Sequence, residues 1–237
     1  MIAPAHGNAI QPYRASLFSG ARLDGLWQAG ILVELDPGWK TYWRMPGDAG
    51  IPPQFDWQGS ANARTVAVSY PVPARFQDAG GETIGYHDKV VFPLSVTPAS
   101  PDQMVGLKLK MFFAVCESVC IPATAELEVV LGVSNSNSLL ASWQQRVPTA
   151  GHAVSNARVE MHDSQTSLVL GLQRPVDDIF VEADAPVYFG KPRFDITSGE
   201  AWLPLANNKG ASALKNTPLR LTLSTGNTGI EQTVTVN

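Results

Sequence analysis

The sequence predicts an all-β protein, in which one antiparallel β-sandwich is followed by a second, smaller β-sandwich. The chain contains 20 glycines and 18 prolines among its 237 residues. These residues interrupt short runs of Val, Ile, Leu, Thr and aromatic residues, a pattern typical of strands joined by turns. No repeating helical pattern separates the runs, which disfavours an architecture that alternates strands and helices.

Short apolar runs give the expected strands of both halves. In the first half they are Ala21–Gly25, Gly30–Leu35, Ala63–Ser69, Val90–Thr97, Val105–Val115 and Ala125–Val133. In the second half they are Arg158–His162, Ser167–Leu172, Ile179–Ala183, Val187–Phe189, Arg193–Ile196, Ala201–Leu205, Leu219–Ser224 and Gln232–Val236. Short antiparallel strands in such numbers are typical of sandwiches.

The two halves are separated by a polar break at residues 134–137. Ser138 could cap a short helix that runs to Val147, before Pro148 ends it. We therefore expect a first domain at residues 1–131, a linker with one short helix at 132–156, and a second domain at 157–237. A sandwich of about 80 residues has a small core, so the two halves are expected to share an interface.

Charge and hydropathy exclude several classes of partner. The net charge is −4 and the basic residues are scattered, so no basic stripe predicts nucleic-acid binding. The longest apolar run, Met111–Cys116, is far shorter than the roughly 18–20 residues of a membrane helix. Residues 1–10 have neither the charged start nor the apolar core of a signal peptide and are typical of a mature terminus.

The two cysteines, Cys116 and Cys120, are the residues most suggestive of chemistry. A disulfide requires Cα atoms within about 7 Å, whereas four extended steps span roughly 13 Å, so the cysteines can pair only if the chain turns sharply after Val115. A ring this small removes little chain entropy, about 2 kcal/mol, which makes it a poor structural staple. A tight pair is more easily reduced, so the spacing favours a redox-active pair over a structural bridge or a metal site.

No metal or other cofactor is expected. The histidines, which are His6, His87, His152 and His162, form no zinc-ligand spacing with the cysteines. The two thiolates could hold Cu(I) with help from Met111 or Met104, although a methionine beside Phe112 in a strand is usually a core residue.

A cluster of aromatic residues follows the second expected strand. It could be a sugar-stacking platform, an aromatic lid or ordinary core filling, which is the default. Strand alternation places on one face Trp39, Thr41 and Trp43, and on the other Lys40, Tyr42 and Arg44. Tyr42 is thus separated from the tryptophans and is the better candidate for a polar site.

Residues 75–86 have no apolar periodicity, and we expect them to form a loop. The glycines in this segment would let it hinge over a neighbouring site. Carboxylates of Asp78 and Glu82 would raise the pKa of a nearby thiol by like-charge repulsion, although solvated loop carboxylates are the simpler interpretation.

Together these motifs resemble a known family. The motifs are Trp39-Lys40-Thr41-Tyr42-Trp43-Arg44, Pro46-Gly47-Asp48-Ala49-Gly50, Ile84-Gly85-Tyr86 and Val115-Cys116-Glu117-Ser118-Val119-Cys120-Ile121-Pro122. They are similar to the N-terminal periplasmic domain of DsbD-type transmembrane thiol:disulfide reductases, and most similar to the suppressor-of-copper-sensitivity branch, ScsB. The resemblance covers residues 20–131.

The resemblance implies an immunoglobulin-like fold and assigns roles to individual residues. It implies that Cys116 and Cys120 are the redox pair and that Cys120 forms the mixed disulfide with partners. The family's active-site tyrosine matches Tyr42. The remaining supporting residues, in and beside the matching cap loop, are Phe76, Gly80, Gly81, Glu82 and Tyr86. The family's better-known members have a longer cysteine spacing and an aromatic cap tip where this chain has Gly80-Gly81.

The function that the resemblance implies is a periplasmic protein-disulfide reductase domain of an inner-membrane protein. It would relay electrons from a thioredoxin-like C-terminal domain of the same reductase to periplasmic thioredoxin-fold partners, by thiol:disulfide exchange without a bound cofactor. Two alternatives remain open: a Cu(I)-binding module for copper tolerance, and a structural interaction module whose disulfide is inert.

Overall fold

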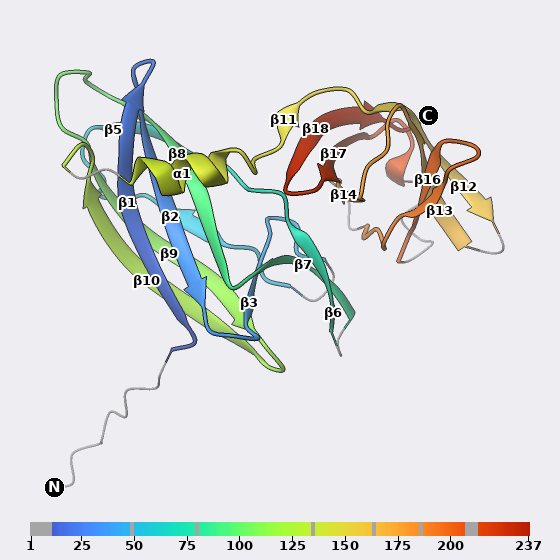
Figure 1. Cartoon of the computed structure of the whole chain (residues 1–237), viewed down its shortest axis with the longest axis horizontal. Helices are drawn as coiled ribbons and strands as arrows, with labels where there is room; N and C mark the ends of the chain where they lie inside the picture. Colours follow the sequence, from blue (N-terminus) through green and yellow to red (C-terminus); the bar gives the residue numbers. More distant parts are fainter. Residues whose placement is uncertain are drawn as a thin grey trace, which may run out of the picture.

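The computed structural model describes residues 11–47, 50–78, 81–133, 136–162, 165–184, 187–206 and 213–237. The chain forms two β-sandwiches side by side, joined by a segment that carries a short helix (Figure 1). The expected all-β fold is therefore confirmed. No helix in these ranges is long and apolar enough to cross a membrane.

The first sandwich consists of two antiparallel sheets. The first sheet has the order β1-β2-β8-β5, from β1 (Tyr13–Leu23), β2 (Leu26–Leu35), β8 (Lys89–Pro98) and β5 (Ala63–Val68). The facing sheet has the order β10-β9-β3-β7-β6, from β10 (Cys120–Val130), β9 (Gly106–Cys116), β3 (Lys40–Tyr42), β7 (Gly81–His87) and β6 (Ala74–Asp78), and β4 (Gln54–Asp56) also pairs with β9.

Side-chain alternation along β9 explains how this sandwich is built. Leu109, Met111 and Phe113 point into a core that also contains Phe92. The alternate residue Lys110 points outward and pairs across the sheet with Glu126 of β10. One face of the sheet is therefore buried against the other sheet, and its opposite face is available for a site.

The helix α1 (Asn137–Gln144) lies against the first sandwich through Leu140 and Trp143. Its N-cap is Ser136, not Ser138, because the amide of Leu140 already donates to the carbonyl of Ser136. The helix also ends at Gln144, before the expected Val147.

The second sandwich also has two sheets. One has the order β11-β18-β17-β14, from β11 (Thr149–Ala150), β18 (Thr228–Thr235), β17 (Pro218–Thr225) and β14 (Asp178–Glu182). The other has the order β12-β13-β16-β15, from β12 (Val154–His162), β13 (Gln165–Leu172), β16 (Glu200–Pro204) and β15 (Arg193–Asp195). Leu168, Leu203 and Leu221 lie in a separate core between them.

Several expected elements differ in the structure. The segment expected as a loop, residues 75–86, lies almost wholly within the β6–β7 hairpin, because backbone pairing with β3 holds it in the sheet despite its polar sequence. Residues expected in the linker form β11 and the start of β12, since they pair with β18 and β13. The expected strand Val187–Phe189 makes only an isolated bridge from Phe189 to Leu205. The first strand begins at Tyr13, and the expected Ala21–Gly25 covers its end and a turn.

Candidate functional site

The two cysteines form a disulfide at the tip of the β9–β10 hairpin. Cys116 ends β9, Cys120 begins β10, and the two are opposite each other in the strand register. Glu117, Ser118 and Val119 form the turn, which brings the two Cα atoms to 4.1 Å. The sharp turn that the spacing requires for pairing is thus present, one residue later than expected.

The two sulfur-bearing residues have different exposure. Cys116 is only 6% exposed, whereas Cys120 is an exposed residue at the start of the edge strand β10. Both share the outer face of the sheet, since Met111, Phe113 and Val115 of β9 occupy its core face. An incoming thiol would therefore meet Cys120 before Cys116.

Tyr42 lies beside the disulfide. Its hydroxyl is 3.1 Å from Cys120 Sγ, and its side chain packs with Ala114 and Cys116. The next residue, Trp43, lies in the sandwich core, so the two aromatics have opposite faces as alternation predicts. Thr41 Oγ1 donates to the carbonyl of Ala114 at 2.9 Å and thereby fixes β3 against β9.

Lys40 is a site residue that sequence reasoning missed. It lies opposite Cys116 in the β3–β9 register, and directly opposed residues have side chains on the same face. Lys40 is only 5% exposed, and its Nζ donates to Thr83 Oγ1 at 2.7 Å. Strand alternation places Lys40 on the same face as Tyr42. Lysines on outer strand faces are usually solvated, so this placement alone did not indicate a site residue.

The β6–β7 hairpin covers Lys40. Thr83 comes from β7, and the ring centroid of Phe76 in β6 lies 5.4 Å from Lys40 Nζ. The half-buried Phe76 also packs edge-on against His87, with ring centroids 5.8 Å apart. The hairpin can approach β3 this closely because Gly85 has no side chain. A Cβ at this position would lie 2.0 Å from the carbonyl oxygen of Thr41.

The remaining sequence-predicted residues of the hairpin have different surroundings. Gly81 begins β7 with a φ of 124°, which favours glycine. Gly80 and the side chain of Asp78 lie outside the described part of the chain. The carboxylate of Glu82 binds Arg75, the residue next to Phe76.

Tyr86 lies on the core side of β7, not on the disulfide face. Its hydroxyl donates to the carbonyl of Pro71 at 2.8 Å, and its ring packs edge-on against Phe92. Burial raises the pKa of Tyr86 well above its usual value of 10.0. Tyr86 thus stabilises the hairpin base from within the sandwich.

The methionines considered as copper ligands are far from the disulfide. Met111 is a core residue on the opposite face of β9 from Cys116. Met104 lies just before the start of β9, at the opposite end of this strand from Cys116. Among the described residues, no three His, Cys, Asp or Glu side chains gather closely enough to hold a metal ion.

Comparisons with known proteins relate the part of the chain that carries the two cysteines to a family of thiol:disulfide interchange proteins. A family model described as "Thiol:disulfide interchange protein DsbD, N-terminal" matches residues 9–132, and a domain family of unknown function matches residues 146–237. No curated protein matches the chain by sequence. Among solved structures, the N-terminal periplasmic domain of ScsB from Proteus mirabilis has the same fold, with a TM-score of 0.69 and 22% identity over 94% of this chain and 92% of that chain.

Proposed function

The chain belongs to the family of DsbD N-terminal domains, and we propose that it exchanges disulfides with other proteins through Cys116 and Cys120. The observation that carries the proposal is the unequal exposure of the two cysteines beside the Tyr42 hydroxyl. An exposed sulfur can be attacked from solvent, and its buried partner can leave and later return without contact with the incoming protein.

The exchange begins when a thiolate of an electron donor attacks Sγ of Cys120. The bond between Cys116 and Cys120 breaks, and Cys116 leaves with the electron pair and takes up a proton. A second donor thiol then attacks the donor sulfur of the mixed disulfide, which releases Cys120 as a thiol and leaves the donor oxidised. Two electrons and two protons have then reached the pair.

The reduced pair passes these electrons on by the reverse sequence. The Cys120 thiolate attacks a disulfide of the acceptor protein, and the Cys116 thiolate then attacks Cys120 in the mixed disulfide. The acceptor leaves as a dithiol, and the bond between Cys116 and Cys120 forms again. The chain thus acts as a protein-disulfide reductase domain that needs no bound cofactor.

The proposed donor is a thioredoxin-like domain of the same membrane reductase, and the proposed acceptors are periplasmic thioredoxin-fold proteins. Family membership supports this route. A periplasmic location is supported by the similar solved structure, which is described as a periplasmic domain. In this proposal residues 1–131 are the redox domain, and the second domain begins with β11, earlier than the expected residue 157.

Single-cysteine variants test the roles of the two sulfurs. The probe is a thioredoxin-fold protein whose one active-site cysteine carries a thionitrobenzoate group, so that capture releases a coloured thiol. Cys116→Ala, which keeps Cys120, should capture the probe rapidly. Cys120→Ala should capture it much more slowly, and equal rates in the two variants would contradict the assignment.

A further inference from the structure

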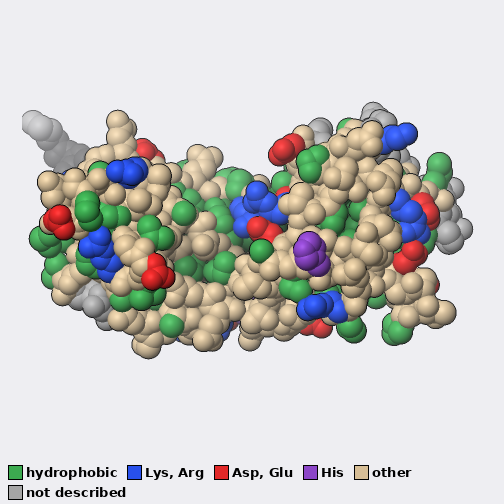
Figure 2. All heavy atoms as spheres, turned by 90° about the horizontal axis from the view of Figure 1, so that it is seen from above, with side chains coloured by type: hydrophobic (Ala, Val, Ile, Leu, Met, Phe, Trp, Pro, Cys, Tyr) green, Lys and Arg blue, Asp and Glu red, His purple; other side chains and the backbone are tan. Residues whose placement is uncertain are grey.

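The edge strand β14 of the second sandwich lies against the first sandwich. Its residues alternate between two cores: Ile179 and Val181 lie in the core of the second sandwich, whereas Phe180 lies in that of the first. Asp178 and Glu182 share the face of Phe180, because strand side chains alternate. Figure 2 shows Lys or Arg and Asp or Glu side chains meeting in the middle of the molecule, between its two halves.

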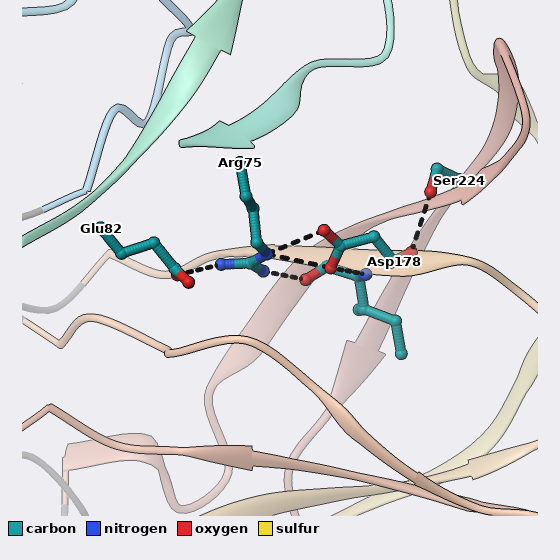
Figure 3. Close-up of polar contacts among 5 residues, drawn as sticks. Arg75, Glu82, Asp178 and Ser224 are labelled. Atoms are coloured by element: carbon teal, nitrogen blue, oxygen red, sulfur yellow. Dashed lines mark hydrogen bonds and ion pairs between the residues drawn. The ribbon is translucent and has the colours of Figure 1, made fainter. Parts of the chain in front are cut away.

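Arg75 connects the β6–β7 hairpin to this strand. Its Nε donates to the Asp178 carboxylate at 2.9 and 3.0 Å, and its Nη2 donates to the carbonyl of Ile179 at 2.6 Å. A third nitrogen, Nη1, binds Glu82 of β7, so the guanidinium lies between the hairpin and β14 (Figure 3). The Arg75 side chain is only 8% exposed, so water competes little for these charge-assisted hydrogen bonds.

Arg44 makes a second connection, from the segment that follows Tyr42. Its Nε and Nη2 donate to Glu182 at 2.9 and 2.7 Å, and Nη2 also binds Glu231 of β18. Between the two arginines, the ring of Phe180 lies 5.7 Å from Trp43 and 4.9 Å from the Arg75 guanidinium. The strand β14 therefore contacts both segments that flank the disulfide face.

Lys40 and Tyr42 point away from the sandwich core, yet they are only 5% and 1% exposed. Lys40 is covered by Thr83 and Phe76 of the hairpin that Arg75 attaches to β14. If this attachment were lost, the hairpin would keep its pairing with β3 but lose its contact with the second sandwich. The disulfide face would then open more often.

We propose that β14 holds the β6–β7 hairpin closed beside the redox pair, with Arg75 as the positioning residue that transmits this restraint. The second sandwich thereby sets how often a thiol can reach the buried Cys116 side of the disulfide, without changing the equilibrium between disulfide and dithiol. This inference rests on the proposed function, since it assigns a control to the same redox pair.

The test measures reduction of the disulfide by dithiothreitol. One dithiothreitol thiolate attacks the disulfide, its second thiol closes the reagent's own ring, and the pair becomes a dithiol. Asp178→Ala, a change in the second sandwich, should raise this rate roughly tenfold, the effect expected when a charge-assisted hydrogen bond no longer holds the closed form. The reduction potential should stay unchanged, because opening accelerates both directions equally.

Two controls separate positioning from general damage. Asp177→Ala removes a neighbouring carboxylate that binds the amide of Gly226 within the second sandwich, and should leave the rate unchanged. Leu203→Val weakens the second core away from β14 and should also leave it unchanged. A similar acceleration in either control overturns the proposal.

A double-mutant cycle tests the coupling directly. Arg75→Ala should accelerate reduction at least as much as Asp178→Ala, because it also removes the hydrogen bond to the carbonyl of Ile179. Adding Asp178→Ala to Arg75→Ala should have little further effect, because Asp178 acts on the hairpin through Arg75. Rates in Asp178→Ala equal to or below those of the unaltered chain overturn the inference about β14. The proposed function fails by a different result, a pair too stable to be reduced in thiol-exchange buffers, whatever the variants do.

Discussion

The hydroxyl of Tyr42 lies 3.1 Å from Sγ of Cys120, within hydrogen-bond distance of the more exposed cysteine. A hydroxyl at this position can donate to the thiolate that forms when the disulfide is reduced. Such a donor favours the charged form of the sulfur, which is the nucleophile in exchange.

Tyr42→Phe should therefore slow the attack by Cys120. A hydrogen bond to a charged group contributes roughly 1.5–3 kcal/mol, so the alkylation rate at neutral pH should fall by about tenfold or more. The rate is measured with iodoacetamide in a Cys116→Ser background, where only Cys120 reacts. Tyr13→Phe, which removes a hydroxyl bonded to Thr124, is the matched control and should have no effect. An unchanged rate in Tyr42→Phe would show that the hydroxyl does not activate Cys120.

Lys40→Met should make the pair harder to reduce. Lys40 lies opposite Cys116 on the same face of the sheet, with its Nζ bonded to Thr83 of β7, and a cation on this face favours a thiolate over a thiol. Its loss destabilises the reduced form, so the reduction potential should move to more negative values. Equilibration with glutathione measures this shift. Lys108→Met, which removes an exposed lysine paired with Glu128 elsewhere on β9, should leave the potential unchanged, and a shift of equal size there would contradict the role of Lys40.

Reduction of the disulfide should cost the fold little stability. The bridge closes a ring of only five residues, from Cys116 to Cys120, for which the chain-entropy model gives about 2 kcal/mol. Urea unfolding of the oxidised and reduced chain should differ by no more than this amount. A much larger loss on reduction would favour a structural role for the bridge.

Ionisation of Tyr70 should contribute to the pH dependence of the free energy of unfolding. Burial is the largest of the effects that raise its pKa from 10.0 to about 12; the Arg44 charge lowers it and the Glu182 charge raises it. Because the fold favours the neutral phenol, this contribution is complete below pH 10 and is lost as the pH rises from 10 towards 12. The free energy of unfolding should therefore fall less steeply in this range in Tyr70→Phe. Identical slopes in the two proteins would contradict this assignment.

The sequence predicted the strands that form apolar runs between turn residues, and it predicted the faces of Tyr42 and Trp43. Buried residues alternate along the first half of β9, whereas β8 is an almost continuous buried run, and both patterns indicate strands. The spacing of the cysteines also showed that they can pair only across a sharp turn, although β10 begins at Cys120, five residues before the expected strand Ala125–Val133. These features depend on neighbours in the chain, so local patterns are sufficient to find them.

The β6–β7 hairpin could not be predicted in the same way. Its sequence is polar and glycine-rich, and distant residues hold it in place: β3 on one side and Asp178 of β14 on the other. Arg75 and Asp178 are 103 positions apart, and no local pattern in the sequence indicates that these two residues pair. Lys40 was missed for a related reason, because the hairpin residue that binds it, Thr83, is 43 positions away in the sequence.

The reduction potential of the bond between Cys116 and Cys120 distinguishes a disulfide that takes part in exchange from a structural one. The purified chain is equilibrated in glutathione or dithiothreitol buffers of known potential, and its free thiols are counted. We expect a potential between roughly −200 and −270 mV, the range of proteins that exchange disulfides. A potential well below about −300 mV would mark a structural disulfide and contradict the exchange function.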